Sequence, residues 1–134
     1  MTLSELRVDA VILACAVSAG IHGALIQDHF EEGTGAGVGF VVATVMLAAL
    51  AVALTYRPTQ LVLLATAATF AGLIATYALV LWTGVPVLHP EREEIESLAL
   101  FTKAVEVVGL VVAASALHRP TFEVTLRHPK GHLT

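Results

Sequence analysis

The stretch GVGFVVATVMLAALAVALTY, residues 37–56, decides the class of fold, because it contains no Asp, Glu, Lys, Arg or His. A helix needs about 20 predominantly apolar residues to cross the hydrocarbon core of a bilayer. The next run, LVLLATAATFAGLIATYALVLWT over residues 61–83, is of similar length and equally free of charge. A helix of a soluble bundle needs a polar face toward water, and neither run has a wide one. Both runs therefore predict membrane-spanning helices.

Two more apolar runs complete a set of four predicted spans: 8–27, 37–56, 61–83 and 97–117. Hydrophobic residues make up 57% of the 134 residues and charged residues 13%, against about 25% charged residues in soluble domains. Short connections place consecutive helices in opposite directions. We therefore predict an all-α integral membrane protein, an antiparallel four-helix bundle that forms one transmembrane domain over residues 1–134, with a short tail over 119–134.

The basic residues predict the orientation of this bundle in the membrane. One side collects most of them: Arg7, Arg57, Arg119, Arg127 and Lys130. An excess of Lys and Arg marks the cytoplasmic side, so both termini of this multi-pass protein should be cytoplasmic. The outer loops should then be residues 28–36 and 84–96. These two loops hold seven of the eleven acidic residues, together with His29 and His89.

Glu106 lies about eight residues, roughly 12 Å, inside the apolar part of the last span. A lone carboxylate at that depth costs a few kcal/mol, so it should face protein and have a partner. Lys103 is the nearest candidate, since residues three apart share a helix face. A structural Lys103–Glu106 pair beside a hydrogen-bonded His22 explains these residues without a function. Intramembrane charges are, however, generally functional, and both interpretations stay open.

Histidines and carboxylates gather near the outer mouth of the predicted bundle. His22 and His29 are seven residues apart and share one helix face, with Glu32 one turn beyond; His89 should reach the same level. Imidazole with carboxylate suits Zn, Cu, Fe or Ni, whereas Mg and Ca prefer oxygen alone. We therefore expect a divalent transition metal, copper or zinc, held by His22, His29, Glu32, His89 and Glu106. Glu106 would be an inner ligand or would orient His22.

Three other interpretations compete with metal binding. The acidic loop and its histidines can simply be a solvated surface. The wide alanine- and valine-rich faces of the second and third spans can dock an accessory subunit onto a larger membrane complex, or onto further copies of the chain. The third interpretation is a proton or ion pathway along His22, Lys103 and Glu106. Toward the inner face, only Gly109, Ala113 and Ser115 of the last span would continue this pathway.

Other functions are not expected from these residues. The single cysteine, Cys15, has no base beside it, which argues against nucleophilic catalysis, and we expect no enzymatic role. No basic surface laced with aromatic residues predicts nucleic-acid binding. Thr69, Thr76 and Thr83 repeat every seven residues and predict a face that packs and hydrogen-bonds against a neighbouring helix.

The segments IHGALIQDHFEE (21–32), TGVP (83–86) and 98–110 with Lys103 and Glu106 carry a resemblance. The chain resembles a group of small four-span bacterial membrane proteins of the actinobacterial type, over roughly residues 10–117. A His on the first helix, a Gly-x-Pro after the third and a Glu in the fourth are the shared features. The resemblance implies the four-span fold and a location in a bacterial inner membrane, and it singles out His22, Pro86 and Glu106.

Overall fold

The computed structural model describes residues 2–83 and 97–118. Within them the chain forms five helices: α1 (Leu3–Ala24), α2 (Ile26–Glu32), α3 (Thr34–Tyr56), α4 (Gln60–Thr83) and α5 (Ser97–Leu117). Four of these helices, α1, α3, α4 and α5, are long and apolar enough to span a membrane, so the predicted all-α class with four long apolar helices is confirmed. The expected outer loop 84–96, with Pro86 and His89, and the tail 119–134 lie outside the described residues.

The first helix begins at Leu3, ahead of the predicted span 8–27. Its start is a capping box, in which the Thr2 hydroxyl accepts a hydrogen bond from the Glu5 amide at 3.2 Å. The Glu5 carboxylate in turn accepts one from the Thr2 amide at 2.6 Å. These reciprocal bonds satisfy amides that have no partner inside the helix. The polar first turn therefore extends α1 beyond its apolar run.

Residues 26–32 form a short helix, α2, so the expectation of a loop over residues 28–36 was wrong for these positions. The chain only bends at Leu25, because the His29 amide still donates to the Leu25 carbonyl at 3.1 Å. α3 then begins at Thr34, directly after Gly33. The Phe30 ring covers Gly37 so closely that an added Cβ would overlap it. This contact holds α2 against α3.

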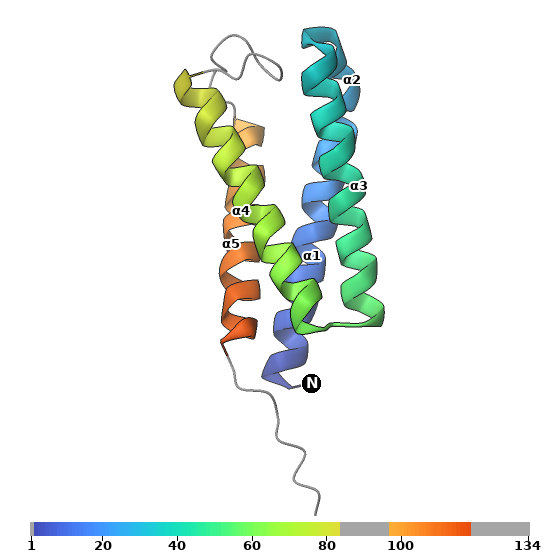
Figure 1. Cartoon of the computed structure of the whole chain (residues 1–134), viewed down its shortest axis with the longest axis vertical. Helices are drawn as coiled ribbons and strands as arrows, with labels where there is room; N and C mark the ends of the chain where they lie inside the picture. The colour runs from blue at the N-terminus through green and yellow to red at the C-terminus, as the bar shows by residue number, and fades with distance from the viewer. Residues whose placement is uncertain (1, 84–96, 119–134) are drawn as a thin grey trace, which may run out of the picture.

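The four long helices lie side by side, with α2 at one end and the connection from α3 to α4 at the other (Figure 1). α1 packs against both α3 and α5, and α4 packs against α5, whereas α3 and α4 touch more sparsely. The core between them contains side chains from all four helices: Val11, Cys15, Leu47, Phe70 and Ala113. α1 thus links α3 to α5 within the bundle.

Gly109 of α5 lies where three of the long helices approach one another closely. A Cβ at this position would lie 2.6 Å from the Phe70 ring of α4 and 3.0 Å from the Ala14 Cβ of α1. Phe70 is fully buried. The glycine therefore leaves the space that the phenyl ring fills.

The threonine hydroxyls of the α4 repeat find hydrogen-bond acceptors within their own helix. The hydroxyls of Thr69 and Thr76 donate to the carbonyls of Ala65 and Gly72 at 2.9 and 2.8 Å. Thr76 and Thr83 are exposed. The face that was expected to pack against a neighbouring helix thus points outward at these two positions. This is possible because a hydroxyl that donates to a carbonyl of its own helix needs no polar neighbour.

Candidate functional site

Glu106 of α5 is fully buried, and both of its carboxylate oxygens accept hydrogen bonds. The Lys103 ammonium donates to Oε2 at 2.7 Å, which confirms the pair predicted from the spacing of three residues. The Ser18 hydroxyl of α1 donates to Oε1 at 2.9 Å. A buried carboxylate is stable only when such partners replace water. The Ser18 bond also ties α1 to α5.

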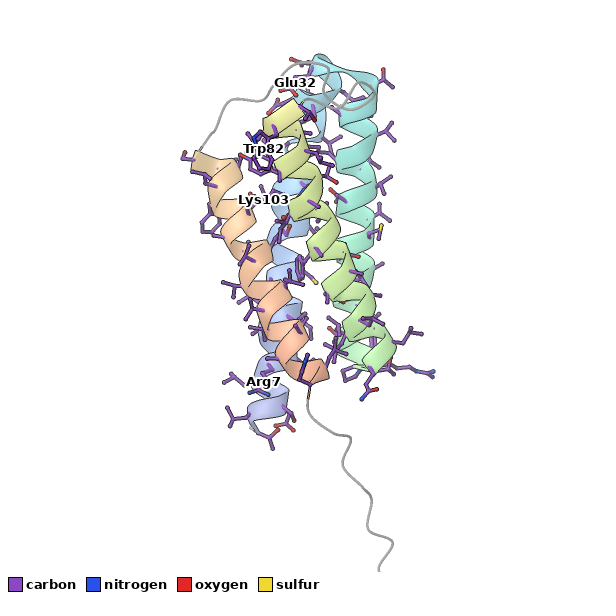
Figure 2. The ribbon with its side chains drawn as sticks, turned by 60° about the vertical axis from the view of Figure 1, so that its left-hand side comes forward. Arg7, Glu32, Trp82 and Lys103 are labelled. Carbon is purple, nitrogen blue, oxygen red and sulfur yellow. The ribbon has the colours of Figure 1, made fainter. Side chains whose placement is uncertain are left out.

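Lys103 has a further neighbour that the sequence did not reveal. Its Nζ lies 5.3 Å from the centroid of the Tyr77 ring of α4, a distance at which the ring face attracts a cation. Figure 2 shows Lys103 on α5, with Glu32 and Trp82 toward one end of the bundle and Arg7 at the other. Lys103 is half-buried. The cation is thus held by a carboxylate and a ring from two different helices.

His22 lies beside this cluster and is also buried. Its Nδ1 is 2.9 Å from the carbonyl oxygen of Ser18, and since a carbonyl only accepts, Nδ1 is the protonated donor. In the neutral imidazole the lone pair is then on Nε2, which lies 3.9 Å from Glu106 Oε1. The contact that orients the ring comes from Ser18. Glu106 faces the free nitrogen, which favours the ligand role for this carboxylate over the orienting role.

His29 of α2 repeats this arrangement further toward the end of the bundle. Its Nδ1 donates to the Leu25 carbonyl at 2.9 Å, and its Nε2 lies 3.9 Å from Glu32 Oε2. The imidazole is buried, whereas 52% of the Glu32 side chain is exposed. Each histidine therefore presents Nε2 toward a carboxylate, one inside the bundle and one at its surface.

Phe40 of α3 contacts both imidazoles. Its ring centroid lies 3.5 Å from that of His29, nearly parallel at 24°, and 5.0 Å from that of His22 at 39°. Both histidines therefore lie within reach of one phenyl ring. Sequence reasoning missed Phe40, because an aromatic residue within a predicted span resembles any other apolar residue.

The structure assembles the expected ligand set as two pairs, His22 with Glu106 and His29 with Glu32. Among residues 2–83 and 97–118, no three His, Cys, Asp or Glu side chains lie close enough together to hold a metal ion. His89, the fifth expected ligand, lies outside the described residues. The two histidines share the Phe40 contact, but Glu106 lies buried inside the bundle and Glu32 lies exposed on α2.

The chemistry available to this cluster is limited by its contacts. The Ser18 hydroxyl donates to Glu106, and its Oγ lies 3.4 Å from His22 Nδ1. Because that nitrogen carries its own proton, it cannot accept the hydroxyl proton, and Ser18 is not arranged as a nucleophile activated by an imidazole. Toward the Arg7 end, Gly109 and Phe70 close the core with apolar atoms. A polar path along α5 thus ends near Glu106.

Comparisons with known protein families, with curated proteins and with solved structures find no match for this chain, so the candidate site rests on its own geometry.

Proposed function

We propose that this chain is a multi-pass protein of the bacterial inner membrane, folded as an antiparallel four-helix bundle. Its four long helices have 21 to 24 residues, which gives about 32–36 Å at 1.5 Å per residue, enough for a hydrocarbon core of about 30 Å. Tyr56 and Trp82 are 81% and 77% exposed and end α3 and α4. Such rings favour the two membrane–water interfaces.

The charges at the two ends support an orientation with cytoplasmic termini. Arg7 lies at the end opposite Glu32 (Figure 2), and Arg57 follows α3 at the connection to α4. Asp28, Glu31 and Glu32 all belong to α2. Because Lys and Arg concentrate on the cytoplasmic side, α2 and the His29–Glu32 pair would lie at the outer face, and the buried His22–Glu106 pair would lie deeper in the bundle.

Within this fold, we propose that the outer end of the bundle binds a divalent transition metal, copper or zinc, through His22 and His29. The observation that carries the proposal is that each Nδ1 is tied to a carbonyl of its own helix, while each Nε2 faces a carboxylate oxygen at 3.9 Å. Histidine ligands are commonly oriented in this way through the other ring nitrogen. Zinc–nitrogen and zinc–oxygen bonds are each about 2 Å long and zinc is tetrahedral, so two ligand atoms of one ion lie about 3.3 Å apart, and each pair would close by about half an ångström on binding.

Glu32 would complete the outer pair, because its exposed carboxylate is accessible to an ion arriving from outside. Glu106 would be the inner ligand, since it faces Nε2 of His22. His89 stays a prediction as a further ligand. A role in metal acquisition, sensing or delivery at the outer face agrees with this placement, since no nucleophile is activated in the cluster.

Purified protein in mild detergent should bind zinc or copper with about micromolar or tighter affinity. Replacing both His22 and His29 by Ala should weaken binding by at least about 10-fold, since both nitrogen ligands are lost. His118→Ala is the matched control, because its Nδ1 also contacts a carbonyl four residues earlier, that of Ala114, on an exposed residue at the other end. Equilibrium titration would measure all three, and equal affinity of the double variant and the control would refute the site.

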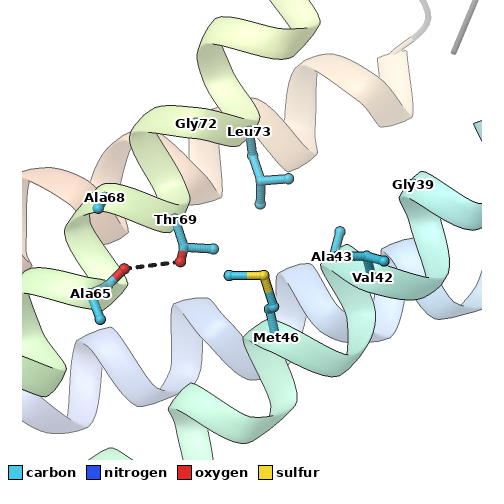
Figure 3. A pocket seen from close by; sticks show the side chains of 9 residues that line it. All are labelled: Gly39, Val42, Ala43, Met46, Ala65, Ala68, Thr69, Gly72 and Leu73. Atoms are coloured by element: carbon cyan, nitrogen blue, oxygen red, sulfur yellow. Dashed lines mark hydrogen bonds between the residues drawn. The ribbon is translucent and has the colours of Figure 1, made fainter. Parts of the chain in front are cut away.

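A second candidate function, that of an accessory subunit, is favoured by an open groove between α3 and α4. The groove has a volume of about 540 Å³ and is almost entirely apolar. Gly39 and Ala43 of α3 and Ala68 and Gly72 of α4 line it, and Met46 and Leu73 project into it (Figure 3). Small residues allow a further membrane helix to approach closely. We propose this groove as the contact with a neighbouring subunit.

Gly72→Leu should abolish association if the groove is that contact, because a leucine side chain would fill it. Gly20→Leu of α1 is the control, since an added Cβ meets no atom within 4 Å at either glycine. Native mass spectrometry of each protein, extracted in mild detergent, would give the composition of its complexes. A monomeric wild-type chain, or complexes that survive Gly72→Leu, would contradict the proposal.

A further inference from the structure

The ammonium of Lys103 already neutralises the carboxylate of Glu106 that a bound cation would use. It lies 2.7 Å from Oε2, while the Ser18 hydroxyl lies 2.9 Å from Oε1. His22 Nε2 approaches the same carboxylate at 3.9 Å. A carboxylate that already faces one tethered positive charge offers little net attraction to a second cation. The negative charge of Glu106, the inner carboxylate of the proposed metal site, is therefore already neutralised by Lys103 before any metal binds.

Burial makes this competition strong. Glu106 is fully buried and only 17% of the Lys103 side chain is exposed, so water and salt screen the ammonium poorly. A divalent ion between His22 and Oε1 would be repelled by the ammonium that lies on the other oxygen of the same carboxylate. Such a repulsion is much stronger in a protein interior than in water, because the effective dielectric constant there is lower. Metal and ammonium thus exclude each other at Glu106.

The position of Lys103 also gives the ammonium a way to leave. Its side chain is long and retains some exposure, and the Tyr77 ring holds the ammonium only by its face. Lys side chains readily extend their charged end toward an interface while the stem stays buried. A shift toward the α2 end of the bundle would remove this neutralising charge from the carboxylate without moving α5.

We infer that Lys103 is a tethered counter-ion that closes the His22–Glu106 pair to metal, and that the pair binds a divalent transition metal only when this ammonium withdraws. The inference deepens the proposed function and rests on it, because it concerns the inner half of the same site. It gives the outer pair, His29 and Glu32, the first contact with an arriving ion. A purely structural role for Lys103 makes a different prediction: replacing Lys103 would lower the stability of the protein and leave its metal affinity unchanged.

Lys103→Met tests the inference, because it removes the charge and keeps an apolar stem. Zinc affinity, measured by titration of the full chain in detergent, should rise at least about 10-fold, which corresponds to about 1.4 kcal/mol. Lys103→Arg keeps the charge and should leave the affinity near that of the wild type. Adding Glu106→Gln to Lys103→Met should abolish the gain, since the carboxylate is then absent. Circular dichroism would verify folding, and Lys103→Gln, which keeps a hydrogen-bond donor, replaces Lys103→Met if the latter does not fold.

The outcomes separate the inference from the proposed function. If the wild type binds zinc through His22 and His29 but the uncharged variants bind no tighter, the inference is overturned and the proposed function stands. If the wild type binds no metal while an uncharged variant binds zinc through Glu106, the inference stands and the proposed function fails. If neither protein binds zinc or copper, both are overturned.

Discussion

Glu106→Leu is expected to lower the free energy of unfolding by about 3–5 kcal/mol, the usual loss when one partner of a buried ion pair is removed. The substitution leaves the Lys103 ammonium and the Ser18 hydroxyl without the carboxylate that accepts their hydrogen bonds at 2.7 and 2.9 Å. Because Glu106 is fully buried, water cannot replace it. Thermal melting in detergent, followed by circular dichroism, would measure the loss.

The double variant Lys103→Met with Glu106→Leu should recover most of that stability. A buried ion pair is often exchangeable for apolar packing of similar volume, because neither charge then has to be desolvated. Glu32→Leu is the control, since its carboxylate also faces a histidine at 3.9 Å but is 52% exposed. Exposed pairs contribute about 0–1 kcal/mol. Equal melting temperatures for Glu106→Leu and the wild type would show that Glu106 does not hold α1 and α5 together.

Gly109→Ala should cost about 1–3 kcal/mol, or prevent folding, because the new methyl group has no space. Its Cβ would lie 2.6 and 2.8 Å from two atoms of the Phe70 ring and 3.0 Å from the Ala14 Cβ. A rigid, fully buried ring cannot move aside without displacing α4. The melting temperature in detergent and the yield of monodisperse protein would record the effect.

Gly20→Ala is the matched control for this substitution. It also changes a glycine inside a long helix, but an added Cβ there meets no atom within 4 Å, so it should be neutral or stabilising by up to about 1 kcal/mol. Combining Gly109→Ala with Phe70→Leu should restore part of the loss, since the smaller side chain leaves space for the methyl group. If Gly109→Ala and Gly20→Ala behaved alike, the close approach of α1, α4 and α5 would be refuted.

The sequence by itself determined the features that depend on residues near each other in the chain. The uncharged runs 37–56 and 61–83 coincide with α3 and α4 because the hydropathy of a span is a property of consecutive residues. The Lys103–Glu106 pair was predictable because helical geometry brings residues three apart onto one face. The start of α1 was missed because the Thr2–Glu5 cap is polar and lies outside the apolar run.

Only the tertiary structure decided which helix faces meet. Ser18 reaches Glu106 across 88 residues of sequence, Phe40 meets two imidazoles of another segment, and Phe70 fills the space at Gly109. α3 and α4 are apolar on all sides, so no polar stripe in their sequence indicates the rotation of each helix about its axis or its position along that axis relative to its neighbours. Those two quantities are set by side-chain packing among all the helices together, and they decide that the expected ligands meet as two separate pairs.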